Sequence, residues 1–185
     1  MKLGLYGGSF DPIHNGHLIL AREARERLGL DRVLFIPAAH SPHKLGSAPM
    51  PGEVRREMLA AALADEAGFS VEECDLHREG PSFAIETVRE LRGRWPEAEF
   101  FYLIGHDNVA KLHTWHSYEV LRRAVQFVVF GRGEHDAPHD FPTIDRRVDI
   151  SATEVRTRVA RGESIRYLVP DPVREIIAHR QLYQE

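Results

Sequence analysis

The sequence predicts an α/β protein with a Rossmann-like, doubly wound parallel sheet flanked by helices and a small C-terminal helical segment. Short apolar runs alternate with helical patterns along most of the chain, which is the order of strands joined by covering helices. Two runs, 100–104 and 125–130, are apolar on both faces, as in sheets that helices cover on both sides. Ligands are therefore expected beyond the carboxyl ends of the strands.

The N-terminal half is expected to contain three strands and two helices. Gly7 and Gly8 end the first strand. Gly29 ends the first helix, and Pro37 closes the second strand. The expected elements are a strand at 3–6, a helix at 16–28, a strand at 33–36, a helix at 53–67 and a strand at 70–74.

The C-terminal half alternates in the same way. Ser82 can cap a helix, and Ser151 starts a Ser-Ala-Thr-Glu run with the capping-box pattern. Pro172 suits the first turn of a last helix. The stretches 38–51 and 131–145 are polar and rich in turn residues, and are expected to be long loops. The expected elements are a helix at 82–94, a strand at 99–104, a helix at 118–123, strands at 125–130 and 148–150, a helix at 151–160 and a helix that begins at 171.

Length and composition limit the class of protein. A chain of 185 residues predicts one domain over 1–185, with the C-terminal helices from about 151 packed on it. The formal net charge of −4 argues against a nucleic-acid partner. Cys74 is the only cysteine, which excludes a disulfide framework and is typical of a reducing compartment such as the cytoplasm. No apolar run reaches the roughly 20 residues that span a bilayer, so no membrane association is expected.

Residues 7–17 read Gly-Gly-Ser-Phe-Asp-Pro-Ile-His-Asn-Gly-His and join the first strand to the first helix. The leading glycines let a phosphate approach the backbone, and the helix start attracts an anion. His14 and His17 lie three residues apart, so both imidazoles can donate to phosphate from one side, and Gly16 is expected to leave room for a nucleotide. The string is neither a P-loop nor a GxGxxG fingerprint. A glycine turn with two incidental histidines is the alternative.

Three further segments at expected strand ends carry side chains suited to a nucleotide. The Ser-Pro-His-Lys run at 41–44 offers Lys44 as a point cation for phosphate, although a solvated loop is the alternative. Asp107, which follows Gly105 by two residues, can accept ribose hydroxyls or cap a helix. Trp115 offers a stacking surface for a flat ring, or belongs to the core.

The helix expected from 151 has a hydroxyl-rich start that can bind phosphate. Ser151 and Thr153 supply hydroxyls and backbone donors, and Arg156 adds a cation. An ordinary capping box is the alternative. His113 and His116 suggest a metal pair, but the sequence offers no further ligands for it.

The string at 7–17 resembles the signature of the HxGH nucleotidyltransferase superfamily. Over nearly its whole length the chain is similar to the bacterial nicotinate-nucleotide adenylyltransferase family, which has the Ser-Pro-His-Lys and Gly-x-Asp motifs at the same places. The resemblance implies that nicotinate mononucleotide is joined to the AMP moiety of ATP, giving deamido-NAD and pyrophosphate in NAD biosynthesis. Mg²⁺ would arrive on the ATP phosphates and not at a metal site of the protein.

The resemblance also implies which residues form the site. His17 would contact the α-phosphate in the transition state, and His14 and Lys44 would act with it on the phosphates. The expected ATP-binding residues are Gly8, Ser9, Phe10, His14, His17, Gly105, Asp107, Ser151, Thr153 and Arg156. The expected mononucleotide-binding residues are Ser41, His43, Lys44, Thr87, Trp115 and Arg132.

Two residues depart from the family's motifs, and several rival interpretations of the function remain. Gly133 replaces the proline of the family's Arg-Pro-Gly, and Ala152 replaces the second serine of its Ile-Ser-Ser-Thr. A phosphopantetheine adenylyltransferase would leave Trp115 without a use. A nicotinamide mononucleotide adenylyltransferase and a non-catalytic nucleotide-binding module are also alternatives. Assembly into a homo-oligomer stays open.

Overall fold

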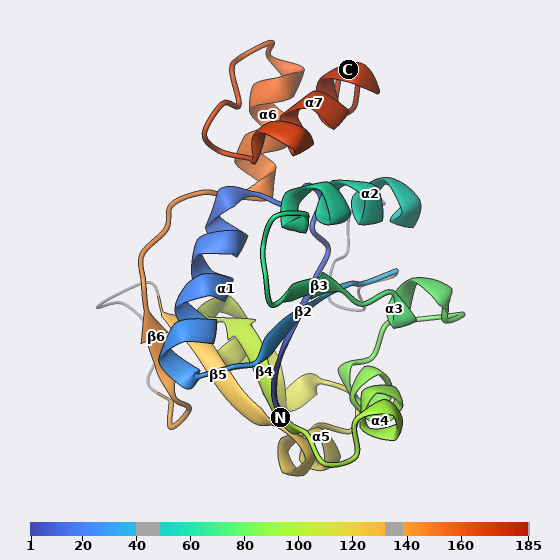
Figure 1. Ribbon diagram of the computed structural model, residues 1–185, viewed down its shortest axis with the longest axis vertical. Coiled ribbons are helices and arrows are strands. Elements are labelled where there is room, and N and C mark those ends of the chain that lie inside the picture. Colours follow the sequence, from blue (N-terminus) through green and yellow to red (C-terminus); the bar gives the residue numbers. More distant parts are fainter. Residues whose placement is uncertain (40–48, 132–138, 185) are drawn as a thin grey trace.

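The structure is a computed structural model that describes residues 1–39, 49–131 and 139–184 (Figure 1). Six strands form one sheet in the order β3-β2-β1-β4-β5-β6, and every neighbouring pair is parallel. This is the doubly wound order, in which the sheet grows outward in both directions from β1 and β4. The predicted fold class is confirmed. The strands are β1 (Lys2–Gly8), β2 (Arg32–Pro37), β3 (Phe69–Val71), β4 (Glu99–Gly105), β5 (Gln126–Gly131) and β6 (Thr143–Asp145).

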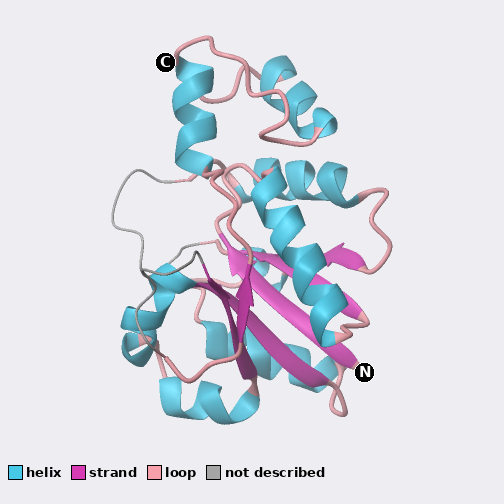
Figure 2. Cartoon of the chain, turned by 90° about the vertical axis from the view of Figure 1, so that its left-hand side faces the viewer, coloured by secondary structure: helices cyan, strands magenta, loops and turns pink. Residues whose placement is uncertain are grey.

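Helices cover both faces of the sheet, as Figure 2 shows. Helical crossovers return the chain from β1, β2, β3 and β4 to the start of the next strand, which keeps the carboxyl ends of the strands at one edge. The described helices are α1 (Asn15–Leu28), α2 (Gly52–Leu63), α3 (Cys74–His77), α4 (Ala84–Arg94), the 3₁₀ helix η1 (His106–Thr114), α5 (Tyr118–Ala124), α6 (Ala152–Ala160) and α7 (Asp171–His179).

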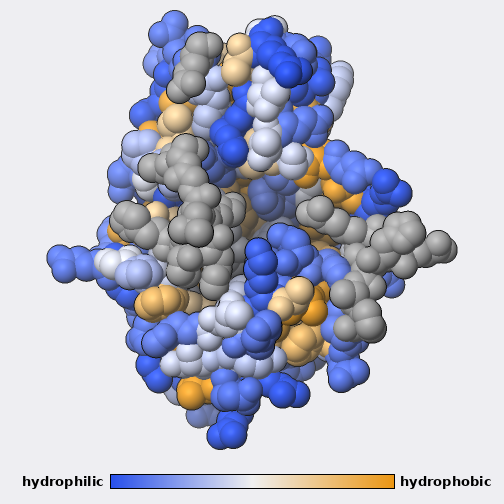
Figure 3. Space-filling model, turned by 180° about the vertical axis from the view of Figure 1, so that it is seen from behind, coloured by the Kyte–Doolittle hydropathy of each residue, from blue (hydrophilic) through white to orange (hydrophobic). Residues whose placement is uncertain are grey.

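Alternate side chains of the strands divide between two apolar cores. In β4, Phe101 and Leu103 belong to the core beneath α1 and α2. Phe100 and Tyr102 belong to the opposite core, beneath α4 and α5. The period of two places successive side chains on opposite faces, which explains why the central strands are apolar throughout. The outer surface in the view of Figure 3 is mostly hydrophilic.

The C-terminal segment packs against the first of these cores. Val155 of α6 and Val173 and Ile177 of α7 are buried with Met58 and Leu59 of α2. Figure 1 shows α6 and α7 beyond one end of the sheet, next to α2. We propose that residues 1–185 form one domain. Within the described ranges, no helix is both long and apolar enough to cross a membrane.

The last strand of the sheet differs from the prediction. The segment 148–150 is not a strand, and β6 instead lies in a stretch that was expected to be loop. Ile144 is buried, but Thr143 and Asp145 on either side are exposed. One apolar residue in a three-residue strand gives no periodic pattern, so sequence reasoning could not find it.

Other boundaries also differ. The helix α2 ends at Leu63 rather than at 67, and Cys74 begins α3 instead of ending a strand. Ser82 does not cap α4, because its hydroxyl accepts the Ala39 N–H at 3.0 Å. The helix η1 was not expected, and it matters because it follows the central strand β4.

Candidate active site

The turn after β1 is held by three segments that are distant in sequence. Arg55 of α2 donates from Nη1 to the Ser9 carbonyl at 2.8 Å. Arg156 of α6 donates from Nη1 to the Asp11 carbonyl at 2.7 Å. The Tyr183 hydroxyl, beyond α7, donates to Asp11 Oδ1 at 2.6 Å. The expected phosphate-binding turn therefore depends on tertiary contacts for its shape.

Arg55 is the buried cation of this arrangement. Its side chain is 1% exposed, and its Nε donates to the Met50 carbonyl at 2.8 Å. Burial lowers the pKa of Arg55, and the nearby Asp11 carboxylate works against that shift. A buried charge is tolerated only when it is paired and hydrogen-bonded, and the carbonyls of Ser9 and Met50 together with Asp11 meet that need.

The Tyr183–Asp11 bond predicts a measurable loss of stability. Tyr183→Phe removes the donor to a buried carboxylate, so we expect the free energy of unfolding to fall by about 1.5–3 kcal/mol. Urea denaturation measures the change. Tyr167→Phe is the control, because the Tyr167 side chain is 76% exposed. Equal stability of the two variants would contradict the contact.

His14 and His17 lie against each other at the start of α1. Their rings stack with centroids 3.6 Å apart and planes 24° apart. The His14 backbone N–H donates to His17 Nδ1 at 3.2 Å. Because Nδ1 accepts this bond, neutral His17 carries its proton on Nε2, which is then a hydrogen-bond donor. His17 therefore has the donor tautomer that phosphate binding requires.

His14 is buried and neutral at pH 7. Its side chain is 6% exposed, and burial lowers the pKa of His14 to about 4. A Cβ on Gly16 would lie 3.0 Å from His14 Nδ1 and 3.3 Å from the Val148 side chain. The His14 ring and Val148 therefore lie close to the Cβ position of Gly16, and the room that Gly16 leaves for a nucleotide stays a prediction.

The low pKa of His14 predicts how stability depends on pH. The unfolded chain binds a proton at this histidine near pH 6.5 and the folded chain only near pH 4, so stability falls as pH drops between these values. Between pH 7 and 4.5, wild type should lose about 2–3 kcal/mol more than His14→Gln. Urea denaturation at both pH values measures the difference, and parallel losses would refute a neutral buried His14.

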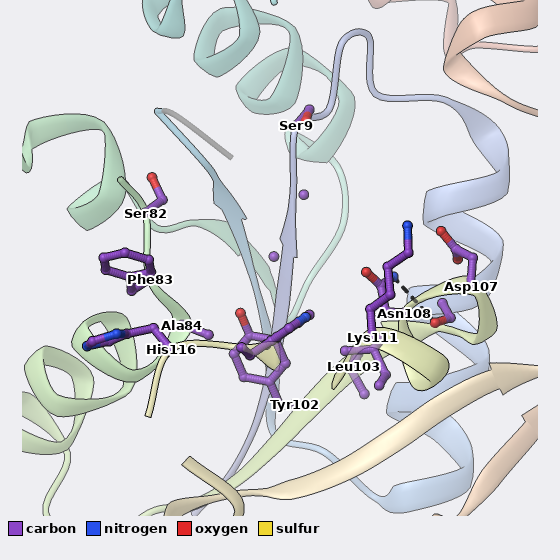
Figure 4. A pocket seen from close by; sticks show the side chains of 15 residues that line it. Ser9, Ser82, Phe83, Ala84, Tyr102, Leu103, Asp107, Asn108, Lys111 and His116 are labelled. Carbon is purple, nitrogen blue, oxygen red and sulfur yellow. Dashed lines mark hydrogen bonds between the residues drawn. The ribbon is translucent and has the colours of Figure 1, made fainter. Parts of the chain in front are cut away.

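A cavity of about 340 Å³ lies beyond the carboxyl ends of β1 and β4 (Figure 4). Four segments line it: residues 7–9, residues 82–84 at the start of α4, residues 102–105 of β4, and the stretch from Asp107 to His116. Ligands of doubly wound sheets bind where the central strands diverge, so the cavity lies where the sequence predicts a site.

Aromatic rings form one part of this cavity. Trp115 is half-buried and meets the ring of Tyr102 edge-on, with centroids 5.9 Å apart and planes at 77°. The rings of Phe83 and His116 stack at 4.5 Å. A flat ring can stack in such surroundings, because aromatic faces offer a large apolar surface.

Gly105 and Asp107 form the other part of the cavity. A Cβ on Gly105 would lie 2.5 Å from Asp107 Oδ1, so the glycine leaves the space into which this carboxylate folds back at the end of β4. The N-cap of η1 is Gly105, and no side-chain bond caps it. Asp107 therefore is not the helix cap that sequence allowed as an alternative.

The motif at the start of α6 is joined to the first motif. Ser151 Oγ accepts the Glu154 N–H at 3.1 Å, which confirms Ser151 as the cap. Arg156 donates to Thr153 Oγ1 at 3.4 Å as well as to the Asp11 carbonyl. The two ends of the chain therefore meet at the turn after β1, although 145 residues separate Asp11 from Arg156.

The predicted residues other than Thr87 fall into three groups. Those that line the cavity are Gly8, Ser9, Gly105, Asp107 and Trp115. Those at or near the turn but outside the cavity lining are Phe10, His14, His17, Ser151, Thr153 and Arg156. Those outside the described residues are Ser41, His43, Lys44 and Arg132.

Two predicted residues are buried behind the site. Phe10 is 2% exposed and packs edge-on against His17 with ring centroids 5.1 Å apart, so its side chain supports the histidine. Thr87 is 1% exposed, and its hydroxyl donates to Asp75 Oδ1 at 2.5 Å. Thr87 does not line the cavity, whereas Phe83 and Ala84 of the same segment do.

Sequence reasoning missed several residues of the site. Lys111 and His116 line the cavity. Because η1 is a 3₁₀ helix with three residues per turn, the four-residue spacing of Asp107 and Lys111 was no signal. Arg55 lies three and four residues before the buried Met58 and Leu59. A cation on an apolar helix face was the available signal for a buried structural role.

Two other kinds of chemistry find no support among the described residues. Cys74 is buried, and burial with the nearby Asp75 and Glu72 raises the pKa of its thiol to about 12, so it is not a thiolate nucleophile. Within residues 1–39, 49–131 and 139–184, no group of three or more His, Cys, Asp or Glu side chains is placed to hold a metal ion.

The comparisons with known proteins agree with this geometry. The cytidylyltransferase-like family matches residues 5–158. A relative from Exiguobacterium sibiricum, named "Probable nicotinate-nucleotide adenylyltransferase", is 43% identical and covers 99% of both chains. One from Thermus thermophilus with the same name is 42% identical and covers 100% of both. The chain belongs to the nicotinate-nucleotide adenylyltransferase family.

Solved structures support the fold of this nicotinate-nucleotide adenylyltransferase family member. The Plasmodium falciparum nicotinic acid mononucleotide adenylyltransferase, complexed with NaAD, superposes with a TM-score of 0.78 at 17% identity. The match covers 98% of this chain and 97% of the other. The same enzyme complexed with APC gives a TM-score of 0.79 at 16% identity. At these identities the likeness concerns the fold.

Proposed function

We infer that the protein is a nicotinate-nucleotide adenylyltransferase, which joins nicotinate mononucleotide to the AMP moiety of ATP and releases pyrophosphate. The observation that carries this inference is the likeness to named adenylyltransferases over the whole chain. The deamido-NAD formed would serve NAD biosynthesis. The bond between Arg156 and the Asp11 turn supports it, because it joins the two phosphate-binding motifs.

The proposed reaction is a direct transfer. A 5′-phosphate oxygen of the mononucleotide attacks the α-phosphorus of ATP, the bond from that phosphorus to the bridging oxygen breaks, and pyrophosphate leaves. Such a transfer depends mainly on positioning and charge stabilisation. We propose that His17 donates from Nε2 to the α-phosphate as its charge rises. Its stacking on neutral His14 and the tautomer set at Nδ1 support this role.

The remaining residues would hold the two substrates. Lys44, Thr153 and Arg156 are proposed to bind the pyrophosphate side or the incoming phosphate, and Gly105 with Asp107 the adenosine ribose. Because Arg156 and Thr153 bond to each other, they would act together.

The mononucleotide is proposed to occupy the cavity, with its pyridine ring stacked on Trp115. Ser41, His43 and Arg132 would contact it from the loops after β2 and β5. The hydroxyl of Thr87 is taken by Asp75, so we propose that Thr87 supports the 82–84 wall and does not touch the ligand.

We propose that ATP binds as its Mg²⁺ complex, with the ion held by the phosphates. An enzyme that makes a dinucleotide from small metabolites needs neither a membrane nor a nucleic acid, and we propose that it works in the cytoplasm. A homo-oligomer is compatible with this function.

The test offers purified protein ATP and Mg²⁺ with nicotinate mononucleotide, nicotinamide mononucleotide or phosphopantetheine, and follows pyrophosphate. We expect release with nicotinate mononucleotide and a lower kcat/KM with the nicotinamide form. Activity with phosphopantetheine alone would assign the rival adenylyltransferase. No release with any acceptor would favour a non-catalytic nucleotide-binding module.

A further inference from the structure

Tyr102 places a hydroxyl group in the cavity that the proposed mechanism does not use. The residue lies in the middle of β4, lines the cavity and is only 7% exposed. Its hydroxyl makes no hydrogen bond with any residue that the structure describes. Figure 4 shows Tyr102 between the wall formed by Ser82, Phe83 and Ala84 and the side that carries Lys111 and Asp107.

The neighbouring backbone leaves room for this hydroxyl. A Cβ on Gly7 would lie 3.0 Å from Tyr102 Oη and 3.8 Å from its Cζ. Glycine at this position therefore lets the phenol lie close to the end of β1. The hydroxyl is thus held between the central strands, at the place where ligands bind in such sheets.

The hydroxyl of Tyr102 is not fully buried, because it faces the cavity. A ligand that fills the cavity would cover this hydroxyl, and a covered hydroxyl is unfavourable unless the ligand accepts its hydrogen bond. Burial raises the pKa of Tyr102 well above its usual value. The phenol therefore stays protonated at neutral pH and can donate one hydrogen bond to a ligand.

The position of Tyr102 limits which part of a ligand it can reach. Its ring meets Trp115 edge-on at 5.9 Å, and its hydroxyl lies beside Gly7, so the phenol lies between the Trp115 ring and the end of β1. A ring stacked on Trp115 would present its substituents to the surrounding wall. Among those substituents a carboxylate would be the strongest acceptor for the phenol.

We propose that Tyr102 is a specificity-determining residue whose hydroxyl donates to the carboxylate of the nicotinate ring. The proposal rests on the proposed function. A hydrogen bond from a neutral donor to a carboxylate is about twice as strong as one to a neutral acceptor. Tyr102 would therefore favour the acid over the amide of the same ring.

Tyr102→Phe tests the proposal, with binding measured by calorimetry and KM by pyrophosphate release. We expect Kd and KM for nicotinate mononucleotide to rise about tenfold. For nicotinamide mononucleotide they should rise less than about threefold, because the lost bond is neutral. The melting temperature should stay equal or rise, since no protein hydrogen bond is lost.

Tyr118→Phe is the matched control. Tyr118 is half-buried, lies on the same face of the sheet against Phe127 at 6.3 Å, and does not line the cavity. We expect this variant to keep the wild-type KM for both mononucleotides. If Kd and KM rise in Tyr102→Phe alone, the rise follows from the position of the Tyr102 hydroxyl. It is then not a general effect of removing a tyrosine hydroxyl from this part of the protein.

Three results would overturn the proposal. Unchanged constants would show that the hydroxyl does not meet the ligand, and equal losses with both mononucleotides would place it on their shared ribose phosphate. A clearly lowered melting temperature would reveal a protein partner for the hydroxyl. If wild type releases no pyrophosphate with either mononucleotide, the proposed function fails instead. The binding constants from calorimetry would still show whether Tyr102 discriminates between the two mononucleotides.

Discussion

His17→Ala is expected to lower kcat about 100- to 1,000-fold while the protein remains folded. The imidazole would donate from Nε2 to the α-phosphate in the transition state, and alanine cannot replace that donor. Removal of one such donor raises the barrier by about 2.7–4 kcal/mol. Pyrophosphate release at saturating substrate measures the loss, and circular dichroism checks the fold.

His179→Ala is the control for this prediction. His179 is exposed at the end of α7, so its loss should leave turnover unchanged. If His17→Ala turns over at the wild-type rate, His17 is not part of the transition-state contact. The role of the stacked histidine pair would then be structural.

Arg55→Met is expected to lower the free energy of unfolding by about 3–5 kcal/mol. The variant leaves the carbonyls of Ser9 and Met50 without their donors, and leaves Asp11 without a nearby buried cation. Because the turn after β1 loses one of its supports, KM for ATP should rise as well. Urea denaturation measures the stability.

Arg56→Met is the matched control on the same helix. The Arg56 side chain is 37% exposed and pairs with Glu53 at 3.0 Å, and exposed ion pairs contribute little to stability. A similar small loss in both variants would contradict the buried role of Arg55.

The sequence was enough to predict the central part of the fold. The strands β1, β2, β4 and β5 are continuous apolar runs bounded by glycine, proline or polar residues, so periodicity and punctuation locate them. The edge strand β6 depends on its pairing with Val129 to Gly131 in β5. Pairing with a neighbouring strand produces no recognisable sequence pattern in a segment of three residues, so β6 could not be predicted.

The candidate site, like the fold, could be predicted only in part from the sequence. Motifs that stand at strand ends were found, because parallel strands bring those ends together. Tyr102 and Tyr183 could not be found, because their positions relative to the cavity and to Asp11 depend on the fold. Arg55 was missed although its place on the apolar face of its helix was a signal. The charge of His14 could not be predicted either. The sequence shows an imidazole, but only its burial in the fold makes it neutral and places it against the His17 ring.

The most direct test of the central claim follows the phosphorus atoms of ATP. The protein is given nicotinate mononucleotide and Mg²⁺ with ATP labelled at the α-phosphorus or at the γ-phosphorus. We expect the α label to enter deamido-NAD and the γ label to leave in pyrophosphate, both only when the mononucleotide is present. An α label released as AMP, or a γ label released as inorganic phosphate, would contradict adenylyl transfer.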